Sequence, residues 1–289
     1  MKKLAACLIA LFMMCSCLTV QAAGNYMELD GLAFTIENGE AVIHAYNGDS
    51  SAVVIPEKLL GAPVTTIDSN AFSGQSGLKS IRFDKASQLR TIGSGAFLGC
   101  TGLQELTIPD SVTGVGFGAF QGCAKLRVLS IGNGLTEISS QAFYGCGELT
   151  DVVIPDSVET IGAYAFGGCG KLKYVLVPNG TTQIQASAFK GSSQVTVKCY
   201  SDSYAQAFAE EQSLPYVLLD KPVLGDVDIN GLINISDVTA IQLYLAESDQ
   251  LSDVQLIAAD VNQDGIIDIA DATHLQLFLA EYLVLSKTS

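Results

Sequence analysis

Apolar residues recur along the chain with a 23-residue period between Asn70 and Gly191. The dipeptide Ala-Phe marks each period, with its phenylalanine at positions 72, 97, 120, 143, 166 and 189, so only the first interval is longer than the others. Each period also holds an apolar strand pattern, seen most clearly at Leu103, Leu106 and Ile108. Such a period is typical of a solenoid, because a coil this small buries its apolar face only against the next coil. We therefore expect a parallel sheet with neighbouring strands about 4.8 Å apart, and a column of phenylalanines through the core.

The repeat resembles the BspA-like, treponemal type of leucine-rich repeat over roughly residues 45–220. One unit matches the pattern of that family in order, at Ile154, Pro155, Val158, Ile161, Gly162, Ala165, Phe166, Gly168, Cys169, Leu172 and Val175. The resemblance implies a leucine-rich repeat solenoid, with a parallel β-sheet and short turns or helices in each 23-residue coil. It also implies a surface or secreted protein with a curved, non-catalytic binding face. One unit departs from the pattern, because the stretch 84–90 is two residues longer and lacks the proline. The register is expected to bulge there.

Both ends of the solenoid should carry caps, because an open end would expose core residues and unpaired strand edges. At the first end, alternating strands over Phe34–Ile36 and Ala41–His44 flank Asn38-Gly39, which is a strong hairpin signal. At the other end the sequence predicts a last strand, an amphipathic helix and a closing strand, at Val195–Cys199, Ser203–Glu211 and Tyr216–Leu219. Asp220-Lys221-Pro222 then breaks the pattern. We expect the solenoid with its caps to occupy residues 24–220.

Residues 1–23 have the composition of a cleaved signal peptide. Two lysines precede an apolar run from Leu4 to Val20, and Val20-Gln21-Ala22 is a small-residue cleavage pattern. Two alternatives are a poor lipoprotein box at Met14-Cys15-Ser16-Cys17 and an uncleaved anchor, for which the apolar run is short. Each interpretation implies export. The mature chain is expected to be extracellular and to contain no membrane span.

Two copies of an oxygen-rich loop, each followed by a helix, occupy residues 221–289. Each loop offers oxygen side chains at positions 1, 3, 5, 9 and 12 and glycine at position 6, the arrangement of an EF-hand calcium loop. The side-chain ligands expected for the first ion are Asp226, Asp228, Asn230, Asn234 and Asp237, and for the second ion Asp260, Asn262, Asp264, Asp268 and Asp271. Leu232 and Ile266 at position 7 would supply backbone carbonyls. The spacing therefore predicts two Ca²⁺ sites.

The loop duplication, in which Asp260 repeats Asp226 and each copy has aspartate at position 12, resembles a type I dockerin over roughly residues 224–284. The resemblance implies a small all-α domain with two EF-hand-like calcium loops, which binds the cohesin modules of a scaffoldin in a cellulosome-like complex. The family positions for cohesin recognition fall on Ile235, Ser236, Gln242, Leu243 and Glu247 in the first copy, and on Ile269, Ala270, Gln276, Leu277 and Glu281 in the second. Because the two sets are nearly identical, either copy could face the partner. The competing interpretation places Leu243 and Leu277 in the helix core.

Charge supports a link between metal and folding in this domain. The full chain has a formal charge of −15, which argues against nucleic acid or an anionic membrane as a partner. Residues 221–289 hold eleven acids and two lysines, a net charge of −9. A segment of this size has a marginal core. We therefore expect calcium binding and folding of the dockerin to be coupled.

Outward strand positions of the repeats become apolar toward the C-terminal coils. The expected ligand row is Val128, Val153, Tyr174 and Leu176, and it would suit a protein or glycan. Ordinary surface scatter, or partial cover by the dockerin, is the competing explanation.

The remaining reactive residues have structural explanations. Four cysteines that follow the 23-residue period, from Cys100 to Cys169, are expected to form a buried ladder of free thiols, since parallel side chains suit neither zinc nor a disulfide. His44 and His274 have no nucleophile near them in sequence. We therefore expect a secreted, non-enzymatic binding protein with a dockerin. The alternative is an enzyme or protease inhibitor that uses the repeat face as its active surface.

Overall fold

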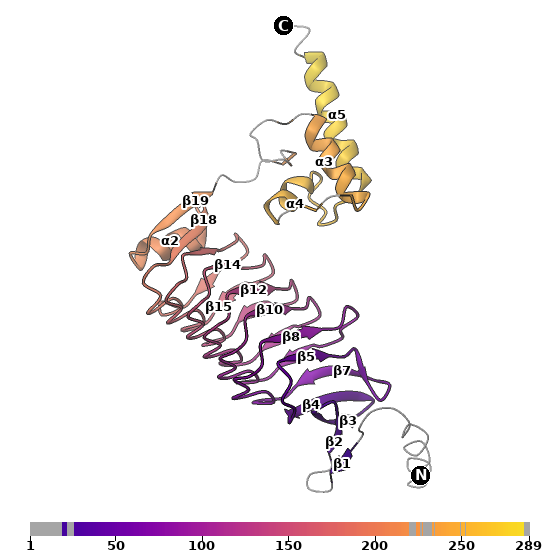
Figure 1. The fold of residues 1–289 in the computed structure, drawn as a ribbon. Helices are drawn as coiled ribbons and strands as arrows, with labels where there is room; N and C mark the ends of the chain where they lie inside the picture. The colour runs from indigo at the N-terminus through magenta and orange to yellow at the C-terminus, as the bar shows by residue number, and fades with distance from the viewer. Residues whose placement is uncertain are drawn as a thin grey trace. The chain divides into compact units, whose positions relative to one another are not determined.

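The computed structural model describes residues 19–21, 26–219, 224–225, 227, 233, 235–248, 250–251 and 253–285. The chain divides into two compact units, Met1–Leu219 and Asp220–Ser289. The first unit is a β-solenoid, and the second contains helices (Figure 1). The predicted fold class of the repeat region is confirmed. The segment 1–18, which holds most of the predicted signal peptide, lies outside the described residues.

The broad face of the solenoid consists of short parallel strands, one from each coil. These strands are β5 (Ala52–Ile55), β8 (Ser80–Phe83), β10 (Glu105–Ile108), β12 (Val128–Ile131), β14 (Asp151–Val153), β16 (Tyr174–Leu176), β18 (Thr196–Tyr200) and β19 (Tyr216–Leu219). They form two four-stranded ladders, in the orders β12-β10-β8-β5 and β14-β16-β18-β19. The expectation of one parallel sheet is therefore met within each ladder, and in the described residues no ladder joins β12 to β14.

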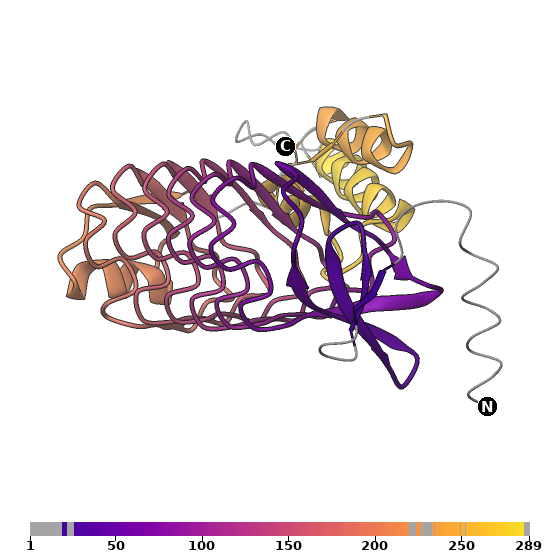
Figure 2. The ribbon, with the colours of Figure 1, turned by 60° about the horizontal axis from the view of Figure 1, so that its bottom comes forward.

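A second set of two-residue strands forms another wall of the coils, and the sequence did not predict it. Its members are β9 (Thr91–Ile92), β11 (Gly114–Val115), β13 (Glu137–Ile138), β15 (Thr160–Ile161) and β17 (Gln183–Ile184). All of its pairings are parallel and join equivalent positions of neighbouring coils, as in Thr66↔Thr91 and Glu137↔Thr160. Figure 2 shows the successive coils lying one behind another.

The phenylalanines of the Ala-Phe pairs form the predicted column. Their rings are stacked from Phe72 to Phe189, with adjacent centroids 4.9–6.0 Å apart and interplanar angles of at most 19°. Burial of each ring contributes roughly 1.5–3 kcal/mol. Both caps continue the column, because Tyr46 stacks on Phe72 and Phe208 meets Phe189 edge-on.

The first cap is built around the predicted hairpin. Its strands are β1 (Thr19–Gln21), β2 (Tyr26–Leu29), β3 (Leu32–Glu37), β4 (Glu40–Tyr46), β6 (Lys58–Leu59) and β7 (Ala62–Ile67). Asn38 and Gly39 both have positive φ, which a tight hairpin of this kind requires. Strand β4 then pairs in parallel with β7, so the hairpin covers the first coil. Strand β1 precedes the predicted cleavage point, so β2 would be the outer strand of a cleaved chain.

The second cap has the predicted strand-helix-strand order. Helix α2 (Tyr204–Glu211) begins at Ser203, whose hydroxyl accepts a hydrogen bond from the backbone N–H of Gln206. A hydroxyl at this position satisfies one of the unpaired amides of the first helical turn. Strand β19 pairs in parallel with β18 and forms the edge of its ladder. The chain leaves the repeat unit after this strand.

Candidate functional site

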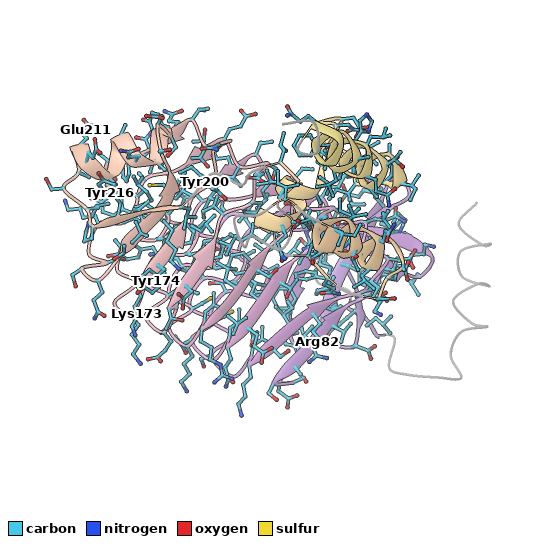
Figure 3. All side chains as sticks on the ribbon, turned by 90° about the horizontal axis from the view of Figure 1, so that it is seen from above. Arg82, Lys173, Tyr174, Tyr200, Glu211 and Tyr216 are labelled. Carbon is cyan, nitrogen blue, oxygen red and sulfur yellow. The ribbon has the colours of Figure 1, made fainter. Side chains whose placement is uncertain are left out.

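Three of the four residues of the predicted ligand row lie exposed on the strand face. Val128, Val153 and Tyr174 are exposed, and Leu176 is half-buried. Val153 lies in register with Leu176 across β14 and β16, so these two side chains are neighbours on one face. Figure 3 shows Tyr174, the first residue of β16, next to Lys173, which precedes that strand. The row forms a continuous apolar and aromatic strip in its C-terminal part.

The strip continues farther than the sequence analysis placed it. Leu176 pairs in register with Lys198 on β18, and Lys198 pairs with the exposed Val217 on β19. The ammonium of Lys198 lies 4.3 Å from the centroid of the Tyr174 ring, a cation–π contact. The signal that could have identified Lys198 is its repeat frame, because it occupies the same strand position as Leu176.

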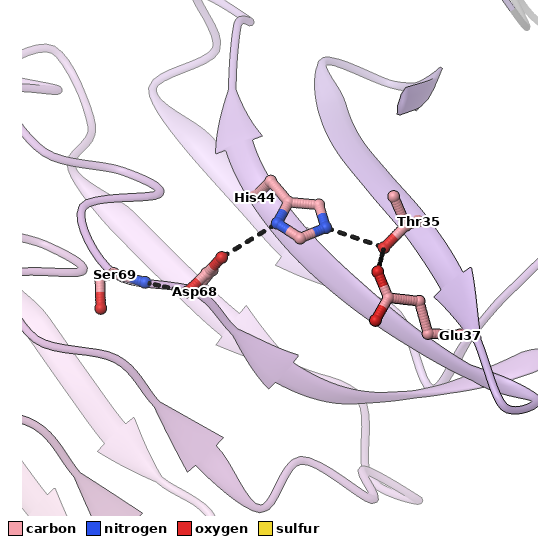
Figure 4. Close-up of polar contacts among 5 residues, drawn as sticks. All are labelled: Thr35, Glu37, His44, Asp68 and Ser69. Carbon is pink, nitrogen blue, oxygen red and sulfur yellow. Dashed lines mark hydrogen bonds and ion pairs between the residues drawn. The ribbon is translucent and has the colours of Figure 1, made fainter. Parts of the chain in front are cut away.

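A polar cluster in the first cap centres on His44 (Figure 4). Its Nδ1 lies 3.0 Å from Asp68 Oδ2, and its Nε2 lies 2.8 Å from the hydroxyl oxygen of Thr35. The Thr35 hydroxyl donates to Glu37 at 3.1 Å. The Thr35 hydroxyl is therefore shared between the imidazole of His44 and the carboxylate of Glu37. The sequence analysis left these partners unidentified, because they lie on separate segments that only the pairing of strands brings together.

The predicted cysteine ladder is confirmed as buried and free of disulfides. Each thiol donates to the carbonyl of a phenylalanine in the preceding coil, as Cys100 does to Phe72 at 3.1 Å and Cys169 to Phe143 at 3.3 Å. Burial raises the pKa of Cys100 to about 11 and the pKa of Cys169 to about 12. These thiols are neutral at physiological pH. They act as small core donors and not as nucleophiles or metal ligands.

The equivalent positions of the flanking coils preserve this hydrogen bond without sulfur. Ser192 donates to Phe166 at 2.7 Å, and the amide of Gln75 donates to Tyr46 at 2.8 Å. A donor at this position is therefore needed in each coil, because the carbonyl it caps is buried.

The C-terminal unit contains three described helices. They are α3 (Ile235–Leu245), α4 (Asp253–Ala259) and α5 (Ile269–Leu285). Its core is small and consists of Val227, Val238, Ile241, Ala259, Ala272 and Leu275. Helices α3 and α5 each begin at position 10 of one of the predicted loops, and each has the aspartate of position 12 in its first turn, Asp237 and Asp271. This is the position that an EF-hand-like loop assigns to its last ligand.

The second predicted calcium loop folds around its own carboxylates. Asp260 accepts hydrogen bonds from the backbone amides of Asp264 and Gly265, at 3.1 and 3.0 Å. Asp271 accepts from the amides of Asn262 and Asp268, at 3.2 and 2.9 Å. Gly265 at position 6 has φ +82°, which favours glycine over any residue with a side chain. The loop therefore turns its polar side chains toward its own centre.

Most of the first loop is outside the described residues. This applies to Asp226, Asp228, Asn230, Leu232 and Asn234. Asp237 is described, and it is fully buried at 0% exposure, as is its equivalent Asp271. Both aspartates therefore sit at the buried start of a helix, in the loop position assigned to the last ligand.

The residues present suit a hard divalent cation. All five side-chain donors of the second loop, Asp260, Asn262, Asp264, Asp268 and Asp271, offer oxygen, and calcium prefers oxygen ligands. Within the part of the chain that is described, no group of three His, Cys, Asp or Glu side chains converges enough to hold a metal ion. The loop carboxylates instead bond to backbone amides, as described above.

The predicted recognition residues form matching surfaces after the two loops. Ile235 and Ile269 are exposed in the first turns of α3 and α5. Of the other predicted residues, Ala270 is half-buried, and the exposed ones are Ser236, Gln242, Glu247 and Gln276. Leu243 is 42% exposed and Leu277 is 59% exposed, so the interpretation of these leucines as helix core is wrong. The side chain of Glu281 lies outside the described residues. The sequence analysis missed Phe278, which is exposed beside Leu277 and whose counterpart in the first copy is Tyr244.

Comparison with known proteins agrees with this architecture. Residues 64–196 match the BspA type leucine rich repeat region in six copies, and residues 224–280 match the dockerin type I domain. The chain carries BspA-type leucine-rich repeats followed by a type I dockerin domain. Both predicted resemblances are confirmed. Leucine-rich repeats and dockerins are binding modules.

Several solved structures are similar to the repeat unit. A leucine rich repeat protein of T. pallidum is 29% identical, with a TM-score of 0.43, over 58% of this chain and 68% of that protein. A leucine rich cell surface protein from Faecalibacterium prausnitzii is 24% identical, with a TM-score of 0.48, over 66% of this chain and 56% of that protein. This chain therefore spans little more than half the length of the Faecalibacterium protein. No curated protein matches the chain.

None of the described helices is both long enough and apolar enough to cross a membrane.

Proposed function

We propose that this chain is an exported, non-catalytic binding protein that attaches through its dockerin to a cohesin module of a scaffoldin. The observation that supports docking most directly is the duplicated exposed pair, Ile235 with Leu243 and Ile269 with Leu277. Large apolar side chains that a small domain leaves exposed at equivalent positions are typical of a protein-binding surface. The chain would then be held in a cell-surface or cellulosome-like complex.

Calcium would hold both recognition surfaces in place. The side-chain oxygens at positions 1, 3, 5, 9 and 12 of each loop would bind the ion, and the carbonyls of Leu232 and Ile266 would add a backbone ligand to each set. Two Ca²⁺ ions would offset four of the nine net negative charges of residues 221–289. Because Asp237 and Asp271 lie in the first turns of α3 and α5, loop and helix would be fixed together. The recognition residues Ile235 and Ile269 directly precede this point.

The apolar strip on the repeat face would bind a second ligand, a protein or a glycan. Val153, Tyr174 and Val217 supply exposed apolar and aromatic surface on strands of one ladder. Docking and ligand binding would therefore use separate units of the chain.

Cohesin binding by full-length variants tests the docking proposal. We expect the wild type to bind at least one immobilised cohesin of a panel in calcium, and to be released by EDTA. Ile235→Asp and Ile269→Asp should each weaken binding only a few-fold, because the other copy still serves. The double variant should weaken it at least 100-fold, which corresponds to about 2.7 kcal/mol.

Tyr174→Ala is the matched control, since it alters an exposed residue of the repeat unit and should leave cohesin binding unchanged. Loss of binding in either single variant would contradict the use of both copies. Retention of binding in the double variant, or in EDTA, would contradict the proposed surface or the role of calcium.

A further inference from the structure

The sheet face contains a hollow of about 430 Å³ between strands β8 and β10. Strand β5 pairs with β8 through four residues, and β10 pairs with β12 through four residues. Between them, β8 and β10 share one register pair, Ser80 with Glu105. The pairing of β8 with β10 is thus present at the first residue of each strand and absent over the rest of both strands.

The sequence explains the interruption. The repeat that contains β8 is the one whose segment 84–90 is two residues longer than its equivalents and lacks the proline. This segment follows β8 directly and turns back on itself, with the amide of Ser87 donating to the carbonyl of Asp84 at 3.0 Å. Leu89 then returns to the core with no exposure. The extra residues are absorbed at the end of β8, where the ladder to β10 is lost.

The hollow combines an apolar floor with a polar rim. Its partly exposed apolar residues are Phe83 and Pro109, and the core residues Ile81 and Leu106 also belong to its lining. The rim carries Arg82 and Lys85 as cations, Asp84, Glu105 and Asp110 as carboxylates, and the hydroxyls of Ser80 and Thr107. Figure 3 shows Arg82 on the strand face, the same kind of position that Tyr174 occupies farther along.

The charged groups of the rim do not neutralise one another. The ion pairs of the described residues are His44–Asp68, Lys58–Glu57, Arg90–Glu40 and Lys171–Glu148, and none includes a rim residue. Asp84 and Asp110 accept backbone amides, from Ala86 at 3.4 Å and from Asn133 at 2.7 Å. These bonds fix the two carboxylates at the edge of the hollow. Donors and acceptors of both signs are therefore presented together above an apolar surface.

We propose that this hollow binds a neutral sugar unit of a glycan. A hydroxyl-rich ring donates to carboxylates, accepts from Arg82 and Lys85, and offers one apolar C–H face to Phe83 and Pro109. With three carboxylates and two cations in its lining, the hollow has a net charge of only −1 and gives little net attraction to a strongly charged ligand of either sign. A wholly apolar ligand would leave the rim groups without partners. The volume lies within the roughly 300–1,000 Å³ of small-molecule sites.

The inference rests on the proposed function of the repeat unit as a ligand-binding module, and it adds to that unit a site for a neutral glycan. It also locates the site on β8 and β10, apart from the apolar strip that includes Tyr174. A protein ligand would need a larger and flatter contact than this hollow offers.

Affinity electrophoresis of the full-length chain tests the inference. The gels would contain soluble β-glucan, arabinoxylan or galactomannan as neutral polymers, and polygalacturonate as the anionic comparison. We expect at least one neutral polymer to retard the wild type. Arg82→Ala and Glu105→Ala should each raise the dissociation constant for that polymer at least tenfold, since each removes hydrogen bonds to sugar hydroxyls.

Arg127→Ala and Asp151→Ala are matched controls, because they remove one exposed cation and one exposed carboxylate from positions outside the hollow. Both should be retarded like the wild type. Retardation by no neutral polymer, or by polygalacturonate alone, would overturn the inference. So would a loss of retardation in Tyr174→Ala that leaves Arg82→Ala unaffected, and in that case ligand binding by the repeat unit would still stand. Cohesin binding, measured on the same preparations, reports on docking separately.

Discussion

The repeat unit and the C-terminal unit hold their shapes by different means. The repeat unit has a continuous apolar core in which phenylalanine rings from successive coils stack at nearly regular intervals. The C-terminal unit has a core cluster of small extent, next to two aspartates that are fully buried. Hydrophobic burial needs no cofactor, whereas buried carboxylates need compensating charge. We therefore expect the repeat unit to keep its fold without a metal ion, and the fold of the C-terminal unit to depend on bound calcium.

The largest effect should come from the centre of the phenylalanine column. Phe120→Ala removes a ring that is 0% exposed and stacked on both sides. We expect a loss of about 3–5 kcal/mol in the free energy of unfolding of the repeat unit, measured by urea denaturation. Phe117→Ala is the matched control in the same coil, because Phe117 is 53% exposed, and it should change stability by no more than about 0.5 kcal/mol. Equal effects of the two substitutions would contradict the account of the core.

Removal of calcium should affect the stability of the C-terminal unit and not that of the repeat unit. With calcium at about 1,000 times its dissociation constant, binding stabilises a folded domain by about 4 kcal/mol per site. EDTA should therefore lower the thermal transition of the C-terminal unit and reduce its helical circular dichroism signal. The β-signal of the repeat unit should not change, which provides an internal control. An unchanged helical signal in EDTA would contradict the coupling of calcium binding to the folding of this unit.

A smaller effect on the stability of the repeat unit should arise from its buried thiols, because the apolar core opposes their ionisation. Burial raises the pKa of Cys100 from its ordinary value near 9 to about 11. The unfolded chain loses this proton as pH rises above 9, while the folded chain retains it, so stability falls between pH 9 and 11. At pH 10 this thiol alone should cost about 1.4 kcal/mol relative to pH 8.

Cys100→Ser isolates that contribution, because a serine hydroxyl does not titrate in this range and can keep the hydrogen bond to Phe72. Urea denaturation at pH 8 and pH 10 should show a smaller loss in the variant than in the wild type. Identical losses would mean that the Cys100 thiol is not shielded from solvent.

Much of the repeat unit was predictable because each coil must bury the same apolar positions against its neighbours. The Ala-Phe spacing predicts the stacked rings, Asn38-Gly39 predicts the hairpin, and Ser203 marks the start of α2. The short strands such as β13 escaped prediction because two residues carry too little periodicity. The interrupted ladder between β8 and β10 was expected only as a bulge, since sequence length shows that residues are added but not where the strands part.

The functional surfaces were predicted unevenly. Ile235 and Ile269 could be located because the loop spacing fixes their position on the helices. The exposure of Leu243 and Leu277 could not be settled from sequence, because an apolar residue on a short amphipathic helix suits either face. Lys198 was missed although it shares the strand position of Leu176, because its contact with the Tyr174 ring joins two different strands. Phe278 was missed because its exposure depends on how the helices pack. Tertiary packing decides such cases.

The uniform coil also makes the solenoid adjustable in length. Because the coils between Phe97 and Phe189 share one register and one hydrogen-bonding scheme, a whole 23-residue coil could be added or removed without altering its neighbours. Each such step would move the terminal helix α2 by one strand spacing, about 4.8 Å, relative to the irregular coil at β8. The number of coils thus sets the distance along the solenoid between the hollow and the C-terminal cap, after which the dockerin follows in the chain.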